Sequence, residues 1–309
     1  MTAPWPASGQ QFHLASGPVT AQVGEVAAVL RSFAVDGFPF TETWDDASVP
    51  PMGCGLVLVP WPNRIPGGRW TLRGAAQQLD ITDVGHGAAI HGLLRNTSYR
   101  LIAQQESSVT QAASIHPQHG YPFTLYTEVT HALSAEGLTV THRLTNAGAD
   151  AAPFGVGVHP YLRVGDRPVS ELTITVTADR YLRTDEHLVP VGAAPVDGTP
   201  YDLRAPVPLA DLDLDVALTG FRTVGGRVEH RLTAPDGTGL VLWADEVFGW
   251  AQVYSPPNFP GPGRPDARRA VAIEPMTCPA NAFNTGAGLL WLEPGQTWSA
   301  SWGLRPVGF

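Results

Sequence analysis

Short runs of alternating apolar and polar residues recur along the whole chain. In one of them Leu172, Ile174 and Val176 alternate with threonines, and similar runs occupy residues 123–129 and 138–142. Successive side chains of a β-strand point to opposite faces, so a period of two is typical of strands with one buried face. Turn sequences that contain glycine separate the runs, at residues 135–137, 146–148, 235–237 and 294–295. The pattern predicts an all-β fold: a large antiparallel β-sandwich with few short helices.

The composition favours many short strands in one domain. Of the 309 residues, 33 are glycine, 29 are proline and only 15% are charged, which disfavours long amphipathic helices. No repeat of fixed period and no change in composition marks a linker, so residues 1–309 are expected to form a single domain. Within it, residues 24–33 are interpreted as strands, residues 209–221 as the only short helical segment, and residues 255–269 as one long surface loop.

Charge and cysteine usage limit the classes of partner. The formal net charge is −9, whereas nucleic acids and anionic membranes are bound by clustered cations, so neither is expected as a partner. No lysine occurs, which excludes enzymes that form a lysine Schiff base, including those that use pyridoxal phosphate. No apolar stretch approaches the roughly 18 residues of a membrane span, and the first residues lack the pattern of a signal peptide. Cys54 and Cys278 are expected to be free thiols, and a cytoplasmic location is the default.

Two segments place a titratable side chain at the end of an apolar strand, directly before a proline. These side chains are His159 and Glu274. Small residues share their strand faces: Gly155 and Gly157 with His159, and Ala270 and Ala272 with Glu274. Open space is therefore expected above both side chains. A carboxylate and an imidazole beside one open space suggest a general base and a general acid around a small ligand.

Two loops carry polar side chains that could bind such a ligand. Arg64 follows Asn63 just before a glycine turn, where a guanidinium can donate several hydrogen bonds to hydroxyl groups. His86 and His91 lie in a glycine-rich segment, but no third histidine or carboxylate stands nearby at metal-ligand spacing. Hydrogen bonding by His91 is therefore favoured over a metal site.

The chain lacks the motifs of several large enzyme classes. It contains no G-x-S-x-G, no Walker-type loop, no G-x-G-x-x-G and no H-E-x-x-H, so serine hydrolases, nucleotide enzymes and zinc proteases have no support. Asp213 and Asp215 are weaker site candidates, because carboxylates in a loop are usually just solvated. Glycosidases generally use two carboxylates about the scissile bond, and only Glu274 is well placed, so hydrolysis is disfavoured.

Four of these stretches, taken in order, resemble the aldose 1-epimerase (galactose mutarotase) family. The family pattern has an Asn-Arg-Ile near a glycine turn, a His-Gly, a His-Pro-Tyr, and a late Glu-Pro followed by Asn-Ala-Phe and Pro-Gly. This chain has them as Asn63-Arg64-Ile65, His91-Gly92, His159-Pro160-Tyr161, Glu274-Pro275, Asn281-Ala282-Phe283 and Pro294-Gly295. The resemblance runs from about residue 20 to the C-terminus.

The resemblance implies a mutarotase-like supersandwich with a sugar site on a concave sheet face, and an isomerase that interconverts the α and β anomers of a free aldose. It implies Glu274 as the general base and His159 as the general acid. The implied sugar-binding residues are Arg64, His91, Asp215, Asn63 and Tyr161. The chain departs from the family pattern at Leu218, which stands where an aromatic residue follows the sugar-binding aspartate.

The implied reaction needs one base and one acid. A carboxylate with a pKa near 4.3 can take the proton of the sugar's O1, and a histidine near 6.5 can supply one to the ring oxygen. No cofactor and no metal are expected, because neither redox chemistry nor group transfer occurs. Two alternatives stay open: a non-catalytic carbohydrate-binding or regulatory protein on the same fold, and an epimerase of a phosphorylated hexose. Arginines that could hold the phosphate are Arg69, Arg73, Arg264, Arg268 and Arg269. The preferred sugar, and whether the protein is a monomer or a homodimer, are not predicted.

Overall fold

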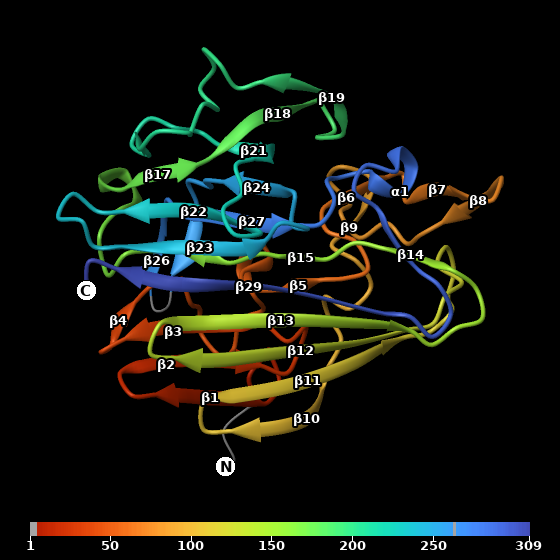
Figure 1. The fold of residues 1–309 in the computed structure, drawn as a ribbon, viewed down its shortest axis with the longest axis horizontal. Helices are drawn as coiled ribbons and strands as arrows, with labels where there is room; N and C mark the ends of the chain where they lie inside the picture. Colours follow the sequence, from red (N-terminus) through yellow and green to blue (C-terminus); the bar gives the residue numbers. More distant parts are fainter. Residues whose placement is uncertain (1–4, 262–263) are drawn as a thin grey trace.

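Antiparallel β-strands make up nearly all of the regular secondary structure of the computed structural model, which describes residues 5–261 and 264–309 (Figure 1). The largest sheet has nine strands. In spatial order they are β10 (Arg100–Gln105), β11 (Ser108–Ile115), β12 (Leu125–Ser134), β13 (Gly137–Asn146), β29 (Thr297–Val307), β23 (Gly239–Asp245), β22 (Arg227–Thr233), β17 (Thr173–Val176) and β20 (Val207–Pro208). Burial along β12 alternates residue by residue, as the period of two predicts.

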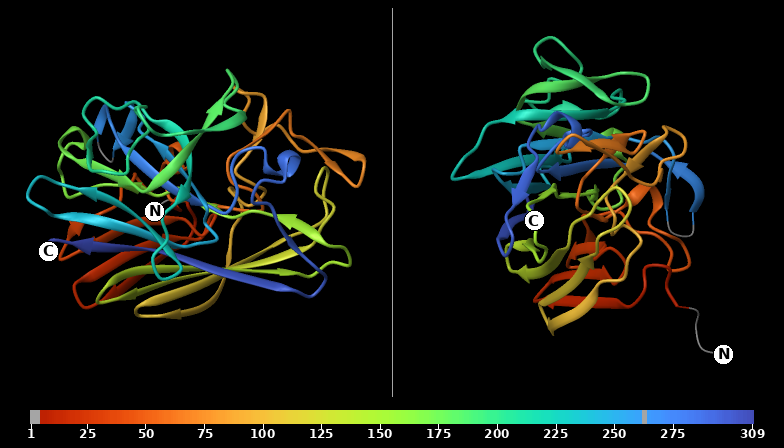
Figure 2. Two further views of the ribbon diagram at one scale, coloured as in Figure 1. Left: turned by 45° about the horizontal axis from the view of Figure 1, so that its top comes forward. Right: turned by 90° about the vertical axis from the view of Figure 1, so that its right-hand side faces the viewer.

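An eight-stranded sheet forms the second large layer. Its order is β19 (Pro190–Pro195), β18 (Ala178–Thr184), β21 (Asp215–Phe221), β24 (Trp250–Tyr254), β27 (Val271–Met276), β15 (Gly157–Val158) and β5 (Val57–Leu58), and β16 (Tyr161–Leu162) also pairs with β27. Figure 2 shows the β18–β19 hairpin projecting at one end of the molecule, far from β10. One apolar cluster includes side chains of both large sheets, so the main core lies between them.

Smaller elements complete the fold. A four-stranded sheet consists of β1 (Gln11–Ser16), β2 (Val19–Gly24), β3 (Leu30–Val35) and β4 (Phe38–Pro39). The strand pairs are β14 (Ala152–Phe154) with β28 (Leu290–Leu292), β25 (Phe259–Gly261) with β26 (Arg264–Arg268), β6 (Arg64–Pro66) with β9 (Ala88–Ile90), and β7 (Arg69–Leu72) with β8 (Ala75–Gln78). The helical segments are α1 (Ala282–Thr285) and two 3₁₀ turns, η1 (Pro51–Gly53) and η2 (Val169–Glu171). In Figure 1, β6 to β9 and α1 lie together beside one end of β27.

Two sequence-based assignments were wrong. The segment 209–221 was expected to be helical, but its second half is strand β21, because β18 and β24 pair with it on both sides. The stretch 255–269 was expected to be one surface loop, yet it holds the β25–β26 hairpin. Phe259 of that hairpin is fully buried against Tyr161, and this apolar contact orders the segment.

Residues 24–33 were predicted to form strands, and the first residue and the last four do so. β2 ends at Gly24 and β3 begins at Leu30, with a connection at 25–29 between them. The all-β prediction is confirmed. Among the residues that the structure describes, no helix has the length and apolarity that a membrane crossing requires.

Candidate active site

Three adjacent strands of the eight-stranded sheet present polar side chains on one face. In β27, Val271 and Ile273 belong to the main core, so Glu274 points to the opposite face, as predicted. Gln252 of β24 lies directly across from Glu274. In the next pair, Asp215 of β21 lies across from Tyr254 of β24. Sheet pairing therefore brings together side chains from a segment of about 60 residues, from Asp215 to Glu274.

His159 lies beside Glu274 because the two short strands that flank it both pair with β27. Gly157 pairs with Met276, and Tyr161 pairs with Ala272. The Nε2 atom of His159 is 3.4 Å from Oε1 of Glu274, and both side chains are almost fully buried, with exposed fractions of 6% and 3%.

Tyr161 lies behind His159 and not in the cavity. Its ring stacks on the imidazole with centroids 5.2 Å apart and planes inclined by 14°, and it is fully buried. It is absent from the residues that line the cavity. The family resemblance implied a sugar contact for Tyr161, whereas in the structure its ring packs against His159 outside the cavity.

The expected open space above the small residues is occupied by protein. A Cβ atom on Gly155 would lie 2.3 Å from the sulfur of Cys278, and one on Gly157 would lie 2.6 Å from Pro62. Ala270 and Ala272 pack in a second apolar cluster with Tyr161 and Phe259. The small residues thus admit neighbouring side chains, and this part of the prediction was wrong. The cavity opens instead between the sheet and the loops that rise beside it.

The loop residues Asn63 and His91 position each other. Both have left-handed backbones, with φ of 54° and 62°. The N–H of His91 donates to the carbonyl of Asn63 at 3.0 Å, and the N–H of Asn63 donates to Nδ1 of His91 at 3.2 Å. Nδ1 is therefore an acceptor, which leaves the proton of neutral His91 on Nε2. Gly92 follows with φ of 75°, where a Cβ would lie 2.1 Å from the carbonyl oxygen of Val59.

Arg64 is held by a carboxylate that the sequence analysis did not single out. Its Nε donates to Oδ2 of Asp83 at 2.7 Å, and His86 approaches the same carboxylate at 3.0 Å. Burial opposes ionisation of Asp83, but the hydrogen bonds from Arg64 and His86 outweigh it and lower its pKa. No motif marks Asp83. The pairing of β6 with β9, together with the β-bridge between Asp83 and Ala88, brings its loop to Arg64.

A hydrogen-bond chain links the loop to the sheet. Nδ2 of Asn63 donates to Oε1 of Gln252 at 3.4 Å, and Nε2 of Gln252 donates to Oδ1 of Asp215 at 2.6 Å. Gln252 is a second site residue that the sequence analysis missed, although an amide between apolar Ala251 and Val253 in a buried strand was an available signal. Asp213, the other predicted aspartate, does not line the cavity.

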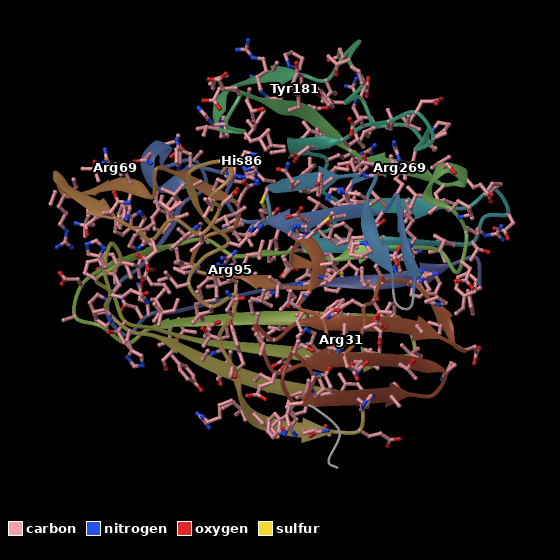
Figure 3. The ribbon with its side chains drawn as sticks, turned by 180° about the vertical axis from the view of Figure 1, so that it is seen from behind. Arg31, Arg69, His86, Arg95, Tyr181 and Arg269 are labelled. Carbon is pink, nitrogen blue, oxygen red and sulfur yellow. The ribbon has the colours of Figure 1, made fainter. Side chains whose placement is uncertain are left out.

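These residues surround one cavity with a volume of about 690 Å³. Six of the seven predicted site residues line it: Asn63, Arg64, His91, His159, Asp215 and Glu274. His86 and Arg95 line it as well, and Figure 3 shows them on one side of the molecule. Within the described residues, no group of three or more histidines, cysteines or acidic residues could hold a metal ion.

Burial dominates the electrostatics of the central pair. It lowers the pKa of His159 to about 4. It raises the pKa of Glu274 well above its usual value, and Asp215 raises it further while Arg64 opposes the change. Burial and the nearby His159 lower the pKa of His91. The isolated site therefore favours neutral imidazoles and a protonated Glu274.

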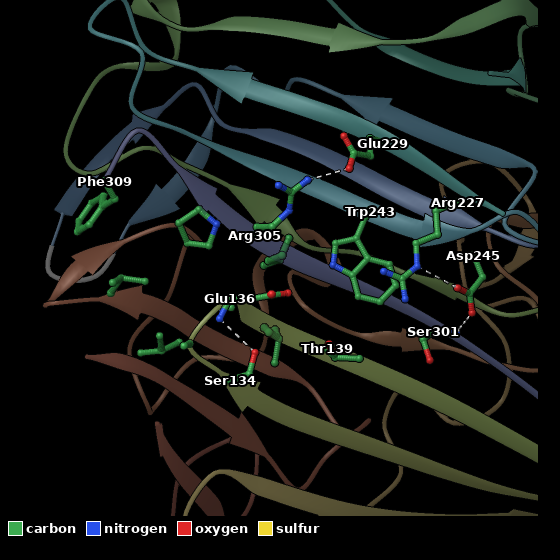
Figure 4. Close-up of a pocket in the computed structure, with 17 residues that line it drawn as sticks. Ser134, Glu136, Thr139, Arg227, Glu229, Trp243, Asp245, Ser301, Arg305 and Phe309 are labelled. Carbon is green, nitrogen blue, oxygen red and sulfur yellow. Dashed lines mark hydrogen bonds and ion pairs between the residues drawn. The ribbon is translucent and has the colours of Figure 1, made fainter. Parts of the chain in front are cut away.

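A second hollow, shown in Figure 4, has a volume of about 870 Å³ and lies over β13, β22, β23 and β29. Its charged side chains largely neutralise one another: Arg305 pairs with Glu229 at 2.8 Å and Arg227 with Asp245 at 3.8 Å. The guanidinium of Arg227 also covers the ring of Trp243, 4.0 Å from its centroid. No histidine is among the described residues that line it. Acid–base chemistry is better supported in the first cavity.

Comparisons with known proteins agree with this geometry. The family model for aldose 1-epimerase matches residues 11–305. The uncharacterized protein YihR of Escherichia coli K12 is 35% identical over 291 residues, which cover 94% of this chain and 91% of YihR. Galactose mutarotase of Rattus norvegicus is 33% identical over 162 residues, but these cover only 50% of this chain and 46% of the mutarotase.

Solved structures share the fold at low sequence identity. A GalM/aldose epimerase homologue from C. elegans superimposes with a TM-score of 0.85 at 17% identity, over 96% of this chain and 98% of the homologue. A putative aldose 1-epimerase from Escherichia coli K12 gives a TM-score of 0.80 at 21% identity, over 96% and 98% of the two chains. At such identities the likeness shows the fold alone.

Proposed function

Because this chain belongs to the aldose 1-epimerase family, we propose that it interconverts the α and β anomers of an aldose by acid–base ring opening and reclosure. The observation that carries the proposal is the pair of His159 and Glu274, 3.4 Å apart on the wall of one cavity. A pyranose in that cavity can contact both side chains at its anomeric centre.

Ring opening moves two protons. Glu274 takes the proton of the O1 hydroxyl while His159 gives the proton on Nε2 to the ring oxygen O5. The C1–O5 bond breaks and C1 becomes an aldehyde. After rotation about the C1–C2 bond, O5 attacks the other face of C1, and both protons return. The reaction needs no cofactor, because no electrons and no groups are transferred.

The pair carries one transferable proton throughout this cycle. Before ring opening the proton is on His159 and Glu274 is ionised, whereas in the open-chain complex Glu274 is protonated and His159 is neutral. Burial lowers the pKa of His159 to about 4 and raises that of Glu274, so the cavity favours the form that accompanies the aldehyde. Moving the proton from Glu274 to His159 before ring opening therefore costs free energy, and the same free energy is recovered when the ring opens.

The remaining residues orient the sugar. His91 presents Nε2–H to a ligand because Asn63 occupies its Nδ1. Arg64, fixed by Asp83, supplies guanidinium donors, and Asp215 accepts from sugar hydroxyl groups. Because hydrogen bonds to Asn63 and Asp83 already fix the side chains of His91 and Arg64, these side chains lose little conformational entropy when a sugar binds.

The test is anomer exchange in the Glu274→Gln variant, measured by NMR magnetisation exchange or polarimetry. We expect wild-type protein to accelerate the exchange and Glu274→Gln to lose about 10²–10⁴-fold, the usual contribution of one acid–base group. Glu293→Gln is the matched control, because it makes the same chemical change at an exposed position outside the cavity. Full activity of Glu274→Gln would reject the base assignment.

The same assay separates the alternatives. Wild-type protein that binds aldoses without accelerating exchange would be a binding protein on this fold. Comparing glucose with glucose 6-phosphate tests the phosphorylated-hexose alternative, for which the predicted arginines Arg69, Arg73, Arg268 and Arg269 do not line the cavity. The side chain of Arg264 lies outside the described residues. We also propose a cytoplasmic location, supported by the two free, buried thiols of Cys54 and Cys278.

A further inference from the structure

Two arginines line the cavity, and their environments differ. Arg64 forms an ion pair with Asp83 at 2.7 Å. Arg95 has no ion pair among the described residues, and its Nη2 makes only a long hydrogen bond of 3.4 Å to the carbonyl of Thr82. Its side chain is half-buried. Because no carboxylate pairs with this guanidinium among the described residues, its charge is available to a ligand.

Arg95 lies on the histidine side of the cavity. From Glu274 the site continues to His159 at 3.4 Å and then to His91, whose ring centroid is 5.5 Å from that of His159. Burial lowers the pKa of His91, and the charges of His159, Arg64 and Arg95 lower it further. Arg95 does not act in this way on Glu274, where Asp215 and Arg64 are the charges that act. The guanidinium of Arg95 also reaches the carbonyl of Thr82, whose hydroxyl accepts a hydrogen bond from the N–H of Ile90 at 2.9 Å, so it lies beside the segment that carries His91.

This position corresponds to a definite part of a pyranose. Atom C5 is bonded to both the ring oxygen and C6, so the C6 substituent projects from the ring edge that carries O5. His159 is the proposed proton donor to O5. A sugar that places O1 at Glu274 and O5 at His159 therefore directs its C6 substituent toward the histidine side, where Arg95 lies.

We propose that the site takes aldoses that carry a monoanionic group on C6 and that Arg95 binds this group, an inference that rests on the proposed ring-opening function. A carboxylate or a sulfonate can accept two parallel hydrogen bonds from one guanidinium. Arg95 thus determines specificity at the end of the sugar that is remote from O1.

The charge balance favours a monoanion over a phosphate ester. A phosphate ester carries about −1.5 to −2 charges at pH 7. Asp83 already engages both Arg64 and His86, so only Arg95 offers an uncompensated charge among the cavity-lining residues described. Asp215 and Glu274 line the same cavity and repel excess negative charge. The predicted arginines Arg69 and Arg269 do not line the cavity, and Figure 3 labels them on either side of Arg95.

The test compares anomer exchange of four sugars at fixed ionic strength: glucose, glucuronate, glucose with a sulfonate in place of the C6 hydroxyl, and glucose 6-phosphate. We expect a higher kcat/KM for at least one monoanion than for glucose and for glucose 6-phosphate. In Arg95→Gln the ratio of kcat/KM for that monoanion to kcat/KM for glucose should fall by about 10- to 100-fold, as for loss of a charged hydrogen bond. Arg69→Gln, an exposed arginine outside the cavity, should keep both the ratio and the rates.

Binding measurements keep this inference separate from the proposed function. If no sugar shows accelerated exchange, the proposed function fails, and titration calorimetry still compares the affinities of wild type and Arg95→Gln for each anion. A wild-type preference for glucose, or an unchanged ratio in correctly folded Arg95→Gln, overturns the inference. A preference for glucose 6-phosphate over both monoanions overturns the charge argument. Whichever of glucuronate and the sulfonate has the higher kcat/KM shows whether the site prefers a planar or a tetrahedral anionic group on C6.

Discussion

At the scale of single residues, the site depends on buried ionisable groups whose neighbours set their proton affinity. Glu274 is buried, and the negative charge of Asp215 adds to the effect of burial on its pKa. His159 is buried beside it, and burial lowers the pKa of His159 to about 4. The pair therefore holds one proton over a window that begins near pH 4 and ends at the raised pKa of Glu274.

The first prediction concerns this window. Below about pH 4, His159 takes a second proton and nothing can accept the proton of O1, so kcat/KM falls. At high pH the pair loses its proton and nothing can protonate O5. Asp215→Asn removes the charge that raises the pKa of Glu274, so the alkaline limb of the kcat/KM profile should move to lower pH.

The position of this limb is the readout, because loss of a sugar contact in Asp215→Asn lowers the height of the profile without moving it. Asp213→Asn is the control, since Asp213 is exposed and does not line the cavity. An alkaline limb at the wild-type pH in Asp215→Asn would contradict the electrostatic coupling of Asp215 to Glu274.

At this scale the sequence was most informative where a side chain has a strict local context. Glu274 and His159 could be proposed because each follows an apolar run directly before a proline, and both line the cavity. The expectation that Glu274 ends its strand was wrong, because β27 continues through Pro275 to Met276. Asp83 could not, because its role depends on Arg64, 19 residues away. Gln252 offered only the signal of an amide between apolar neighbours, and its role depends on Asp215, 37 residues away. The open space predicted beside the glycines near His159 was wrong, because a sequence does not show whether a ligand or a neighbouring side chain fills such a space.

At the scale of elements, the nine-stranded sheet carries buried histidines that the proposed reaction does not use. His131 of β12 and His142 of β13 are fully buried, and burial lowers the pKa of each to about 3. The indole N–H of Trp302 donates to Nε2 of His142 at 3.1 Å. His230 of β22 is also buried, and its pKa is about 4.

The second prediction is that acid destabilises this sheet. The unfolded chain binds protons on these histidines below pH 6.5, whereas the folded chain does not until pH 3 to 4. Stability therefore falls as pH decreases through this interval, by about 1.4 kcal/mol per pH unit for each histidine. The raised pKa of Glu274 makes the folded chain more stable as pH decreases, but this is one group and the histidines are several. Urea unfolding at pH 7, 6 and 5 measures the slope.

A single substitution tests the origin of that slope. Glutamine does not titrate, so His131→Gln should reduce the slope by about 1.4 kcal/mol per pH unit. His187→Gln, at a position that is 64% exposed, should leave it unchanged. Equal slopes in wild type and His131→Gln would show that carboxylates and not buried histidines control the acid sensitivity.

The elements themselves could be predicted wherever local alternation agrees with tertiary pairing. The runs at 123–129, 138–142 and 172–176 all fall on strands of the nine-stranded sheet. The segment 209–221 failed because β21 is buried along consecutive residues, 216–218, so alternation is lost. The hairpin within 255–269 failed because its order depends on the contact of Phe259 with Tyr161, almost a hundred residues away in the chain.

At the scale of the whole molecule, the site exists only when distant parts of the chain are assembled together. Asn63 of the loop contacts Gln252 of β24, and His159 contacts Glu274 of β27. Each contact joins segments more than 100 residues apart, so the cavity and the fold are expected to form in one cooperative step. The two cysteines report on this step, because Cys54 packs in one cluster with Tyr161 and the sulfur of Cys278 lies next to Gly155.

The last prediction uses these thiols as probes of cooperative unfolding. Cys54 is 1% exposed and Cys278 is fully buried; burial raises the pKa of Cys54, and it raises that of Cys278 to about 12. Both should react with a disulfide reagent at pH 8 at least about 10³-fold more slowly than in urea-unfolded protein, since reaction requires global opening. The single-thiol variants Cys54→Ala and Cys278→Ala follow each site separately and should show the same dependence on urea. If Cys54 reacts at urea concentrations that leave Cys278 protected, the wall behind His159 opens independently, and the site is not part of one cooperative unit.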